Sequence, residues 1–459
     1  MKKASYLLTL ILILSLVFTG CGKTELNSDI PATAEINADY ENATYIVLSG
    51  DKATVNEKAV ESFDYTWNID PSKEEPWYEG TEPKTSEVCY IARDIWYYPM
   101  LDESKFVKMN YDGETEWVYY YENSNLKDYI FSTLPVLGNA LPKEMMHDKN
   151  EAYSNPVLHI TEPGTYVLTG TWNGQIMVDL GDKDECFTDE SKKVTLILDN
   201  CNVTCTVAPA FICYSAYECD NTWEDRETYS NTVDTKDAGI NIILADGSVN
   251  SFTGANIYRL LKPTYKKDST SVQKKLLKID GAFYSYVSMN INGEKNGSGI
   301  LNVTSTTFEG MGSELHLTIN GGYINVYSQD DAINVNEDNV SVFTMNDGTL
   351  HIFAGLGAEG DGVDSNGYIV VNGGLIAGGT PSGSDSLLDS DRGNTINGGQ
   401  VIVIGSSGFG GGMGMMRPDG FGGNDRPDGF GGNNRPDNNG GKPGFDNGFP
   451  FDPSQFNHA

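Results

Sequence analysis

The sequence predicts an all-β protein whose main part is a right-handed parallel β-helix, a solenoid of about 26 residues per coil. Asparagine-led turns recur at Asn320, Asn346, Asn372 and Asn397, spaced by 26, 26 and 25 residues. Short β-branched runs ending in Asn, Asp or Gly lie between them. Repeats of this length stack into coils, and parallel crossovers are right-handed. Residues in one sequence column then lie about 4.8 Å apart, the spacing of paired strands.

The residues around the turns suit short strands with one face turned inward. Glycines at 373, 374, 398 and 399 permit the positive φ that a tight corner needs. The inward-facing apolar positions are Val363, Ile369, Val371, Ile376, Ile396, Val401 and Val403. We therefore expect residues 156–405 to form the β-helix, with 45–61 supplying its first strands.

Upstream of the clear repeats, short β-branched runs at 166–170, 175–179, 194–200 and 240–247 predict earlier coils. Residues 214–237 and 256–278 interrupt them as inserted loops. The second insert is rich in lysine, which suits either an interaction loop or a solvated one.

Residues 62–155 break the pattern and predict an aromatic-rich β insertion. This segment contains Trp67, Trp77, Trp96 and Trp117. Such residues could form stacking platforms for sugars or the core of a small module, and the sequence favours the core.

The two ends differ from the rest of the chain. Residues 1–21 read as a lipoprotein signal peptide, because Lys2 and Lys3 precede a short apolar run that ends at Cys21. Cys21 would carry the lipid; a plain signal peptide or a short membrane anchor are the alternatives. Residues 22–44 suit a tether, and the Gly/Pro/Asn-rich 406–459 predict a disordered tail. We expect an extracytoplasmic lipoprotein, anchored by its lipid at the bacterial cell surface.

A formal net charge of −33 makes nucleic acid and anionic lipid surfaces poor partners. It favours divalent cations instead. Apart from Cys21, most cysteines fall between 186 and 219, where buried thiols are favoured over disulfides, although export permits either.

Aligning the coils on their turn asparagines groups polar residues into three columns. The first contains Glu309, Asp331, Asp361 and Ser386, with Asp330 and Glu359 beside it. The second contains Gly312, Asn334, Asp364 and Asp389, and the third contains Glu314, Asn336, Asn366 and Asp391. Carboxylates about 4.8 Å apart repel by about 3.5 kcal/mol at an effective dielectric of 20 and about 1 kcal/mol in water.

Either the pKa values of these carboxyl groups rise or a cation neutralises them. Oxygen ligands of this kind suit Ca²⁺, which takes six to eight oxygens. The predicted ligands are chiefly Asp331, Asp361, Asp364, Asp389 and Asp391, with Asp330, Glu359, Asn334 and Asn366 around them. The alternative is a set of solvated turns, in which Asp and Asn serve only as turn formers.

The ordered set of motifs resembles a known family. Residues 166–170, 196–200, 243–247, 361–365 and 388–391 are similar to the secreted carbohydrate-binding domain family of parallel β-helix proteins, itself similar to pectate-lyase-like β-helices. The resemblance covers about 156–405. It implies Ca²⁺ between coils and binding to acidic pectin and cellulose without established cleavage. Ser386, Gly312 and Asn334 depart from it, because each replaces an acid.

Three functions remain open. The favoured one is a non-catalytic, Ca²⁺-dependent polysaccharide-binding lipoprotein that acts as a monomer. A uronate lyase would need a base, and Lys295 and Arg392 are the only basic residues from 279 to 405, with Arg392 the candidate. This enzymatic alternative also leaves open a glycosidase with paired carboxylates. The third function is a structural surface adhesin with a protein partner.

Overall fold

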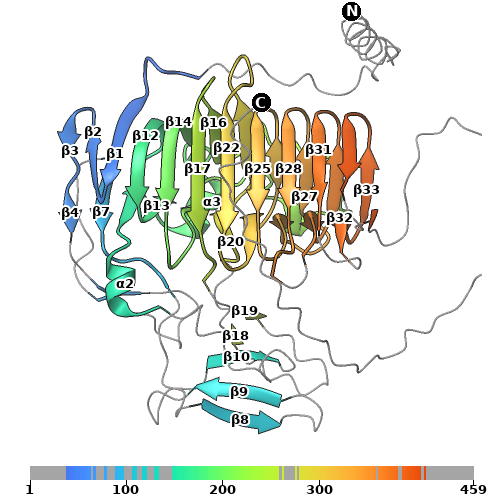
Figure 1. Cartoon of the computed structure of the whole chain (residues 1–459), viewed down its shortest axis with the longest axis horizontal. Helices are drawn as coiled ribbons and strands as arrows, with labels where there is room; N and C mark the ends of the chain where they lie inside the picture. Colours follow the sequence, from blue (N-terminus) through green and yellow to red (C-terminus); the bar gives the residue numbers. More distant parts are fainter. Residues whose placement is uncertain are drawn as a thin grey trace, which may run out of the picture. The chain divides into compact units, whose positions relative to one another are not determined.

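The structure is a computed structural model in which nearly all regular elements are β-strands (Figure 1). It describes residues 38–63, 88–97, 147–257, 279–357, 360–380 and 385–404 in full, and otherwise only the strands at 66–68, 77–79, 106–110, 116–120, 129–133, 261–262, 274–275 and 408–409. The helical elements of this part are α2 (Lys149–Tyr153), α3 (Lys183–Thr188) and the 3-10 turn η4 (Trp223–Asp225). No helix in these ranges is long and apolar enough to cross a membrane.

Most strands belong to three parallel series, and each passage of the chain adds one strand to each (Figure 1). Series I contains β16 (Ile240–Leu244), β21 (Met289–Gly293), β24 (Leu317–Ile319), β27 (Val342–Met345), β30 (Tyr368–Val371) and β33 (Gly393–Ile396). Series II contains β17 (Val249–Gly254), β22 (Ile300–Ser305), β25 (Tyr323–Tyr327), β28 (Thr349–Phe353), β31 (Leu375–Gly379) and β34 (Gln400–Val403). Both start at the long β14 (Val194–Thr204), which pairs with β16 and with β17.

Series III forms the second large sheet. Its strands are β11 (Val157–Ile160), β13 (Gln175–Asp179), β15 (Phe211–Ser215), β20 (Gly281–Ser285), β23 (Glu309–Ser313), β26 (Ile333–Val335), β29 (Val363–Ser365), β32 (Ser386–Ser390) and β35 (Gly408–Phe409). The register follows the sequence repeat closely: Leu317 pairs with Phe343, and Phe343 with Ile369, 26 residues later each time.

The N-terminal strands complete both sheets. β1 (Thr44–Gly50) pairs in parallel with β12 (Gly164–Asn173), which pairs with β14, while β2 (Lys52–Val55) and β3 (Lys58–Ala59) follow in antiparallel order. β4 (Ser62–Phe63) and β7 (Cys89–Ala92) belong to the second sheet, where β7 pairs with β11. The segment expected to be one insertion from residue 62 to 155 therefore contributes two strands to this sheet.

Two smaller sheets lie within the inserts. β5 (Thr66–Asn68) and β6 (Trp77–Glu79) form a hairpin. β8 (Phe106–Asn110), β9 (Glu116–Tyr120) and β10 (Tyr129–Thr133) form an antiparallel sheet that continues through β18 (Leu261–Lys262) and β19 (Lys274–Lys275). The aromatic-rich insert and the lysine-rich insert, separate in sequence, thus share one sheet.

Apolar side chains stack in ladders between the series. Leu301, Ile324, Leu350 and Ile376 occupy one such row, and each is fully buried. Burial of an aliphatic side chain of this size contributes about 1.5–3 kcal/mol, so the ladder is a main source of stability. Cys201, Cys205 and Cys213 lie in the same core as free thiols, and burial raises the pKa of Cys205 and Cys213 to about 12. Trp96 is also buried here, against Tyr214.

The turns between series I and II are stabilised by an asparagine ladder. The Nδ2 of Asn346 donates to Oδ1 of Asn320 at 2.8 Å, and Asn372 donates to Asn346 in the same way. The ladder extends to Asn292 on one side and Asn397 on the other. Gly374 follows with φ +72°, where a Cβ would lie 2.6 Å from a backbone oxygen. The repeat asparagines are thus the hydrogen-bonding groups of the corner.

Residues 218–237, which we call the strap, lie across the outer face of series I. At its start, the buried carboxylate of Glu218 accepts hydrogen bonds from Ser288 N and Oγ at 2.7 and 2.8 Å. Thr235 then bonds Thr318 at 2.8 Å, and Asn231 donates to Oγ1 of Thr395 at 3.3 Å. The loop expected at 214–237 is therefore tied to β24 and β33 and, through Ser288, to the start of β21.

Candidate functional site

The polar columns deduced from the sequence lie on neighbouring strands of series III. In the second column Gly312 pairs with Asn334, Asn334 with Asp364, and Asp364 with Asp389. The first and third columns run along either side of it, at the ends of the same short strands. The sequence repeat therefore brings the predicted ligands onto adjacent strands.

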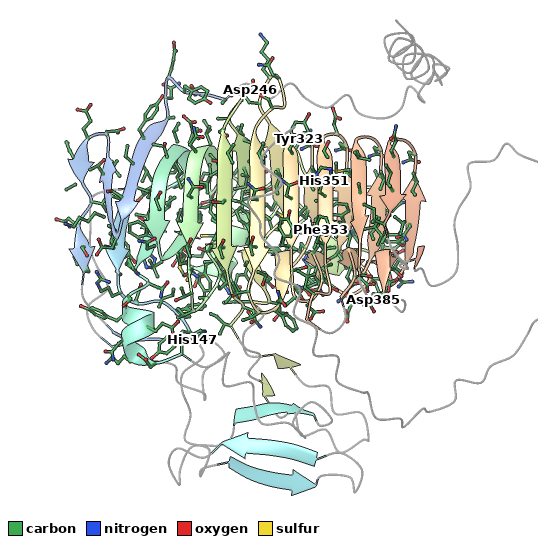
Figure 2. All side chains as sticks on the ribbon, viewed as in Figure 1. His147, Asp246, Tyr323, His351, Phe353 and Asp385 are labelled. Atoms are coloured by element: carbon green, nitrogen blue, oxygen red, sulfur yellow. The ribbon has the colours of Figure 1, made fainter. Side chains whose placement is uncertain are left out.

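First-column carboxylates cap the backbone of the next turn. Oδ1 of Asp331 accepts from the backbone N–H of Asp361 at 2.6 Å. Oδ1 of Asp361 accepts from Ser386 N in the same manner. The neighbouring Asp385 accepts from Gly360 N at 3.2 Å (Figure 2). These bonds are those expected of turn formers, so turn capping is one established role of this column.

Burial and like charge perturb two of these carboxyl groups. Burial, followed by the charges of Asp361, Asp389 and Asp391, raises the pKa of Asp364 to about 7. Burial and the charge of Asp364 also raise the pKa of Asp331 well above its usual range. Carboxyl groups whose pKa is raised in this way favour either a proton or a cation.

Asn334 offers a buried amide group beside the same carboxylates. Its Nδ2 donates to Oε1 of Glu309 at 3.1 Å and to Oδ2 of Asp331 at 3.3 Å. These two bonds fix the amide orientation, and the Oδ1 is buried without a hydrogen-bond partner. A buried carbonyl oxygen in this condition suits a metal ion or a water molecule.

Some polar groups of the third column are already engaged in local hydrogen bonds. Asn366 donates from Nδ2 to the carbonyl of Asn336 at 2.6 Å and to Asp338 at 3.0 Å. Asp391 bonds to Ser365 through its backbone N–H. Asp338 was not among the predicted residues. Ten residues separate Asn336 from the turn at Asn346, whereas six separate Asn366 from Asn372, and Asp338 lies in this extra length, which the column alignment did not include.

Steric crowding explains why the second column has a glycine at position 312. A Cβ on Gly312 would lie 2.8 Å from the ring of Tyr284, which is fully buried. The hydroxyl of Tyr284 donates to Glu314, and Nδ2 of Asn336 reaches the same hydroxyl at 3.4 Å. An aromatic ring thus fills the place of a missing acid, and the oxygen column starts at Asn334.

The predicted ligands do not all converge. Within the described ranges, no three His, Cys, Asp or Glu side chains come together as a group that could hold a metal ion. Glu359 and Cys21 lie outside the described residues. The donor chemistry fits a hard cation, whereas the side-chain positions correspond to the turn-capping arrangement.

Arg392, the candidate base for a lyase, contacts the strap. Its guanidinium carbon lies 5.8 Å from the ring centroid of Tyr229. Its backbone N–H donates to Gly367. The side chain is therefore engaged on the side of the strap rather than directed at the second column.

The sequence analysis missed a second surface, the outer face of series II. Tyr323 lies on β25, and His351 and Phe353 lie on β28 (Figure 2). The burial of 323–327 and 349–353 alternates strictly between core and surface. That alternation is visible in the sequence, and the aromatic residues at the outward positions were the signal that could have revealed this face.

Comparisons with known proteins match this chain to a family model, to a relative and to a solved structure. A family model described as carbohydrate-binding domain-containing protein matches residues 154–240 and 226–413. A protein of that description from Acetivibrio thermocellus is 30% identical over 168 residues, 36% of this chain and 43% of the relative, so less than half of the relative is spanned. A solved structure, a gadolinium derivative of a polysaccharide lyase-like protein from C. thermocellum, is 25% identical with a TM-score of 0.35, over 56% of this chain and 90% of that one.

The matched segments run from just after α2 to just beyond the last strand of series III and contain both the carboxylate columns and the series II strands. They cover more than half of the chain. The chain therefore belongs to the family of carbohydrate-binding domain-containing proteins.

Proposed function

We propose that this protein binds acidic plant-type polysaccharide, such as pectin, or cellulose, without cleaving it. The binding domain would be a right-handed parallel β-helix of about 26 residues per coil, in keeping with the register of the paired strands. A lipid on Cys21 would anchor it at the cell surface. Family membership supports the carbohydrate partner.

The observation that carries the proposal is the stack of Asn334, Asp364 and Asp389 on adjacent strands, with the pKa of Asp364 at about 7. A polyuronate would be repelled by this column unless a cation intervened. Bound Ca²⁺ would supply positive charge that both sets of carboxylates share.

The chain's own residues would prepare such a site. Asp364 and Asp389 would provide carboxylate oxygens, and Asn334 its unpartnered Oδ1. The first-column Asp331 and Asp361 would contribute their second oxygens while Oδ1 of each caps a turn. Asp391, Asp330, Glu359 and Asn366 complete the proposed set.

The test is retention of the full chain, purified in mild detergent, on insoluble polygalacturonate with Ca²⁺ or with EDTA. We expect retention in Ca²⁺, release by EDTA, and loss of retention in Asp364→Asn/Asp389→Asn. Asp189→Asn, an exposed acid away from the columns, is the matched control. Retention that is unchanged by EDTA and by the double substitution would refute binding through bridging Ca²⁺.

The same supernatants test the non-catalytic claim. Absorbance from unsaturated uronate products should stay at the level of the polymer alone. Product that disappears in Arg392→Ala would make the protein a lyase instead.

A further inference from the structure

The outer face of series II contains no charged residue, although the protein carries a net charge of −33. In each strand the burial alternates, which identifies the outward positions. They are Val249, Ser251 and Thr253; Ile300, Asn302 and Thr304; Tyr323, Asn325 and Tyr327; Thr349, His351 and Phe353; Leu375, Ala377 and Gly379; and Gln400 and Ile402. We call this set the series II face.

Large apolar side chains on this face are exposed to an unusual degree. Val249 is 45% exposed, and Tyr323 and Ile402 are each 47% exposed. The face crosses six strands, roughly 24 Å at the spacing of parallel strands. An apolar surface of this kind is typical of a binding site.

Polar groups on the same face form a directed ladder. Nδ2 of Asn325 donates to Oδ1 of Asn302 at 2.8 Å, so its Oδ1 faces the next strand. That oxygen lies 2.9 Å from Nδ1 of His351 and must accept its proton. The neutral ring of His351 therefore presents Nε2 as an acceptor.

Aromatic rings concentrate on the two central strands. The rings of Tyr327 and Phe353 stack with centroids 5.4 Å apart and planes within 5°. Tyr323 lies at the other end of β25 from Tyr327 (Figure 2). On the next strand, β31, Ala377 and Gly379 are paired with His351 and Phe353. Because these two residues are small, they project little from the sheet.

We propose that the series II face binds an extended, uncharged glycan, with Tyr323 packing against the apolar side of a sugar ring and His351 accepting a hydrogen bond from a hydroxyl group. The inference rests on the proposed polysaccharide-binding function and assigns the neutral ligand to a surface separate from the carboxylate columns. Sugars combine apolar C–H faces with hydroxyl donors, which matches apolar rows beside a polar ladder.

Charge selects the neutral ligand over a polyuronate. The series II face provides no Lys or Arg to pair with a uronate carboxylate. The surrounding protein is strongly acidic and would repel a polyanion that approached without cations. A neutral chain avoids this penalty.

The experiment measures retention of the full chain on insoluble cellulose and, in parallel, on polygalacturonate, always with Ca²⁺. Tyr323→Ala and His351→Ala should each weaken retention on cellulose by roughly fivefold, the effect of one lost ring contact for Tyr323 and of one lost hydrogen bond for His351. Retention on polygalacturonate should not change. Tyr323→Phe should retain cellulose binding, because it keeps the ring.

Two further variants control for position and folding. Tyr229→Ala removes a tyrosine of similar exposure (42%) on the strap and should bind cellulose normally. Thr349→Glu places a carboxylate beside Tyr323 without truncating a ring and should also weaken binding. Unchanged cellulose retention in Tyr323→Ala, His351→Ala and Thr349→Glu would overturn the inference.

The parallel polymers separate this inference from the proposed function. Wild-type retention on polygalacturonate alone would refute the series II assignment and leave the calcium-bridged function standing. Retention on cellulose alone, lost in the face variants, would do the reverse. Retention on neither polymer would refute both.

Discussion

The series III columns and the series II face show opposite uses of the same stacking. On series III, carboxylates repeat from strand to strand, and burial together with their mutual repulsion raises the pKa of Asp364 to about 7. On series II, amide and imidazole groups repeat, and each hydrogen-bonds the next. Stacking places identical groups next to one another, so its effect depends on the group. Stacked charges repel one another and favour a bound counter-ion, whereas stacked neutral polar groups hydrogen-bond to one another.

The largest expected effect is the pH dependence of stability in metal-free protein. The folded pKa of Asp364 is raised, so its contribution is fully present below the unfolded pKa near 4 and is lost as pH rises through about 7. The free energy of unfolding should fall by about 2–4 kcal/mol over this window.

Urea unfolding in EDTA at pH 5 and pH 8 measures this loss. Asp364→Asn should flatten the profile, and Ca²⁺ at pH 8 should restore stability. If the stability of the wild type depended on pH as little as that of Asp364→Asn, the stacked carboxylates of series III would not differ from the neutral groups of series II in their effect on stability.

The next effect compares an added methyl-sized group on each series. Gly312→Ala should destabilise the fold by about 1–3 kcal/mol, because its Cβ meets the buried ring of Tyr284 at 2.8 Å. Ala377→Thr, on the partly exposed series II face, should cost less than about 0.5 kcal/mol. Thermal unfolding of the two variants gives the difference, and equal losses would show that Tyr284 repositions freely.

A smaller loss is expected at the corner between series I and II. Asn346→Leu removes two side-chain hydrogen bonds of 2.8 Å and should cost about 1–2 kcal/mol in urea unfolding. Asp347→Asn, at the exposed neighbouring position, serves as control. If both variants unfold alike, the ladder has no net stabilising role.

The smallest effect on stability is expected for Tyr323→Ala. Its ring is half exposed, so its removal should change the free energy of unfolding by no more than about 0.5 kcal/mol. A much larger loss would mean that the series II face is a structural surface, like the inner faces of the same strands.

Much of the strand architecture could be predicted because the repeat is local. Asn320, Asn346, Asn372 and Asn397 set the register, and the paired strands follow it at the same spacing. The columns followed from that register, so Asn334, Asp364 and Asp389 were placed together correctly. The parallel β-helix, its hand and the bound calcium stay predictions.

Contacts between distant segments could not be predicted. The bond of Thr235 to Thr318 and the pairing of β10 with β18 join polar or short segments with no periodic signal. From the sequence, Gly312 was interpreted as a position at which an acid had been replaced. The structural reason for the glycine, the ring of Tyr284, lies on the preceding strand of series III and is distant in sequence. The series II face was not predicted because its outward residues are neutral, whereas the predicted site was drawn from columns of charged residues.

The strap has a consequence for how the paired strands would resist a pulling force, such as a polysaccharide bound as proposed would exert. A pulling force would tend to peel terminal strands away one at a time, since each strand pairs only with its neighbours. Residues 218–237 bond to Ser288, Thr318 and Thr395, and Arg392 lies over Tyr229. Peeling would therefore have to break contacts to a segment anchored several strands away, so the strap acts as a lengthwise brace that shares the load.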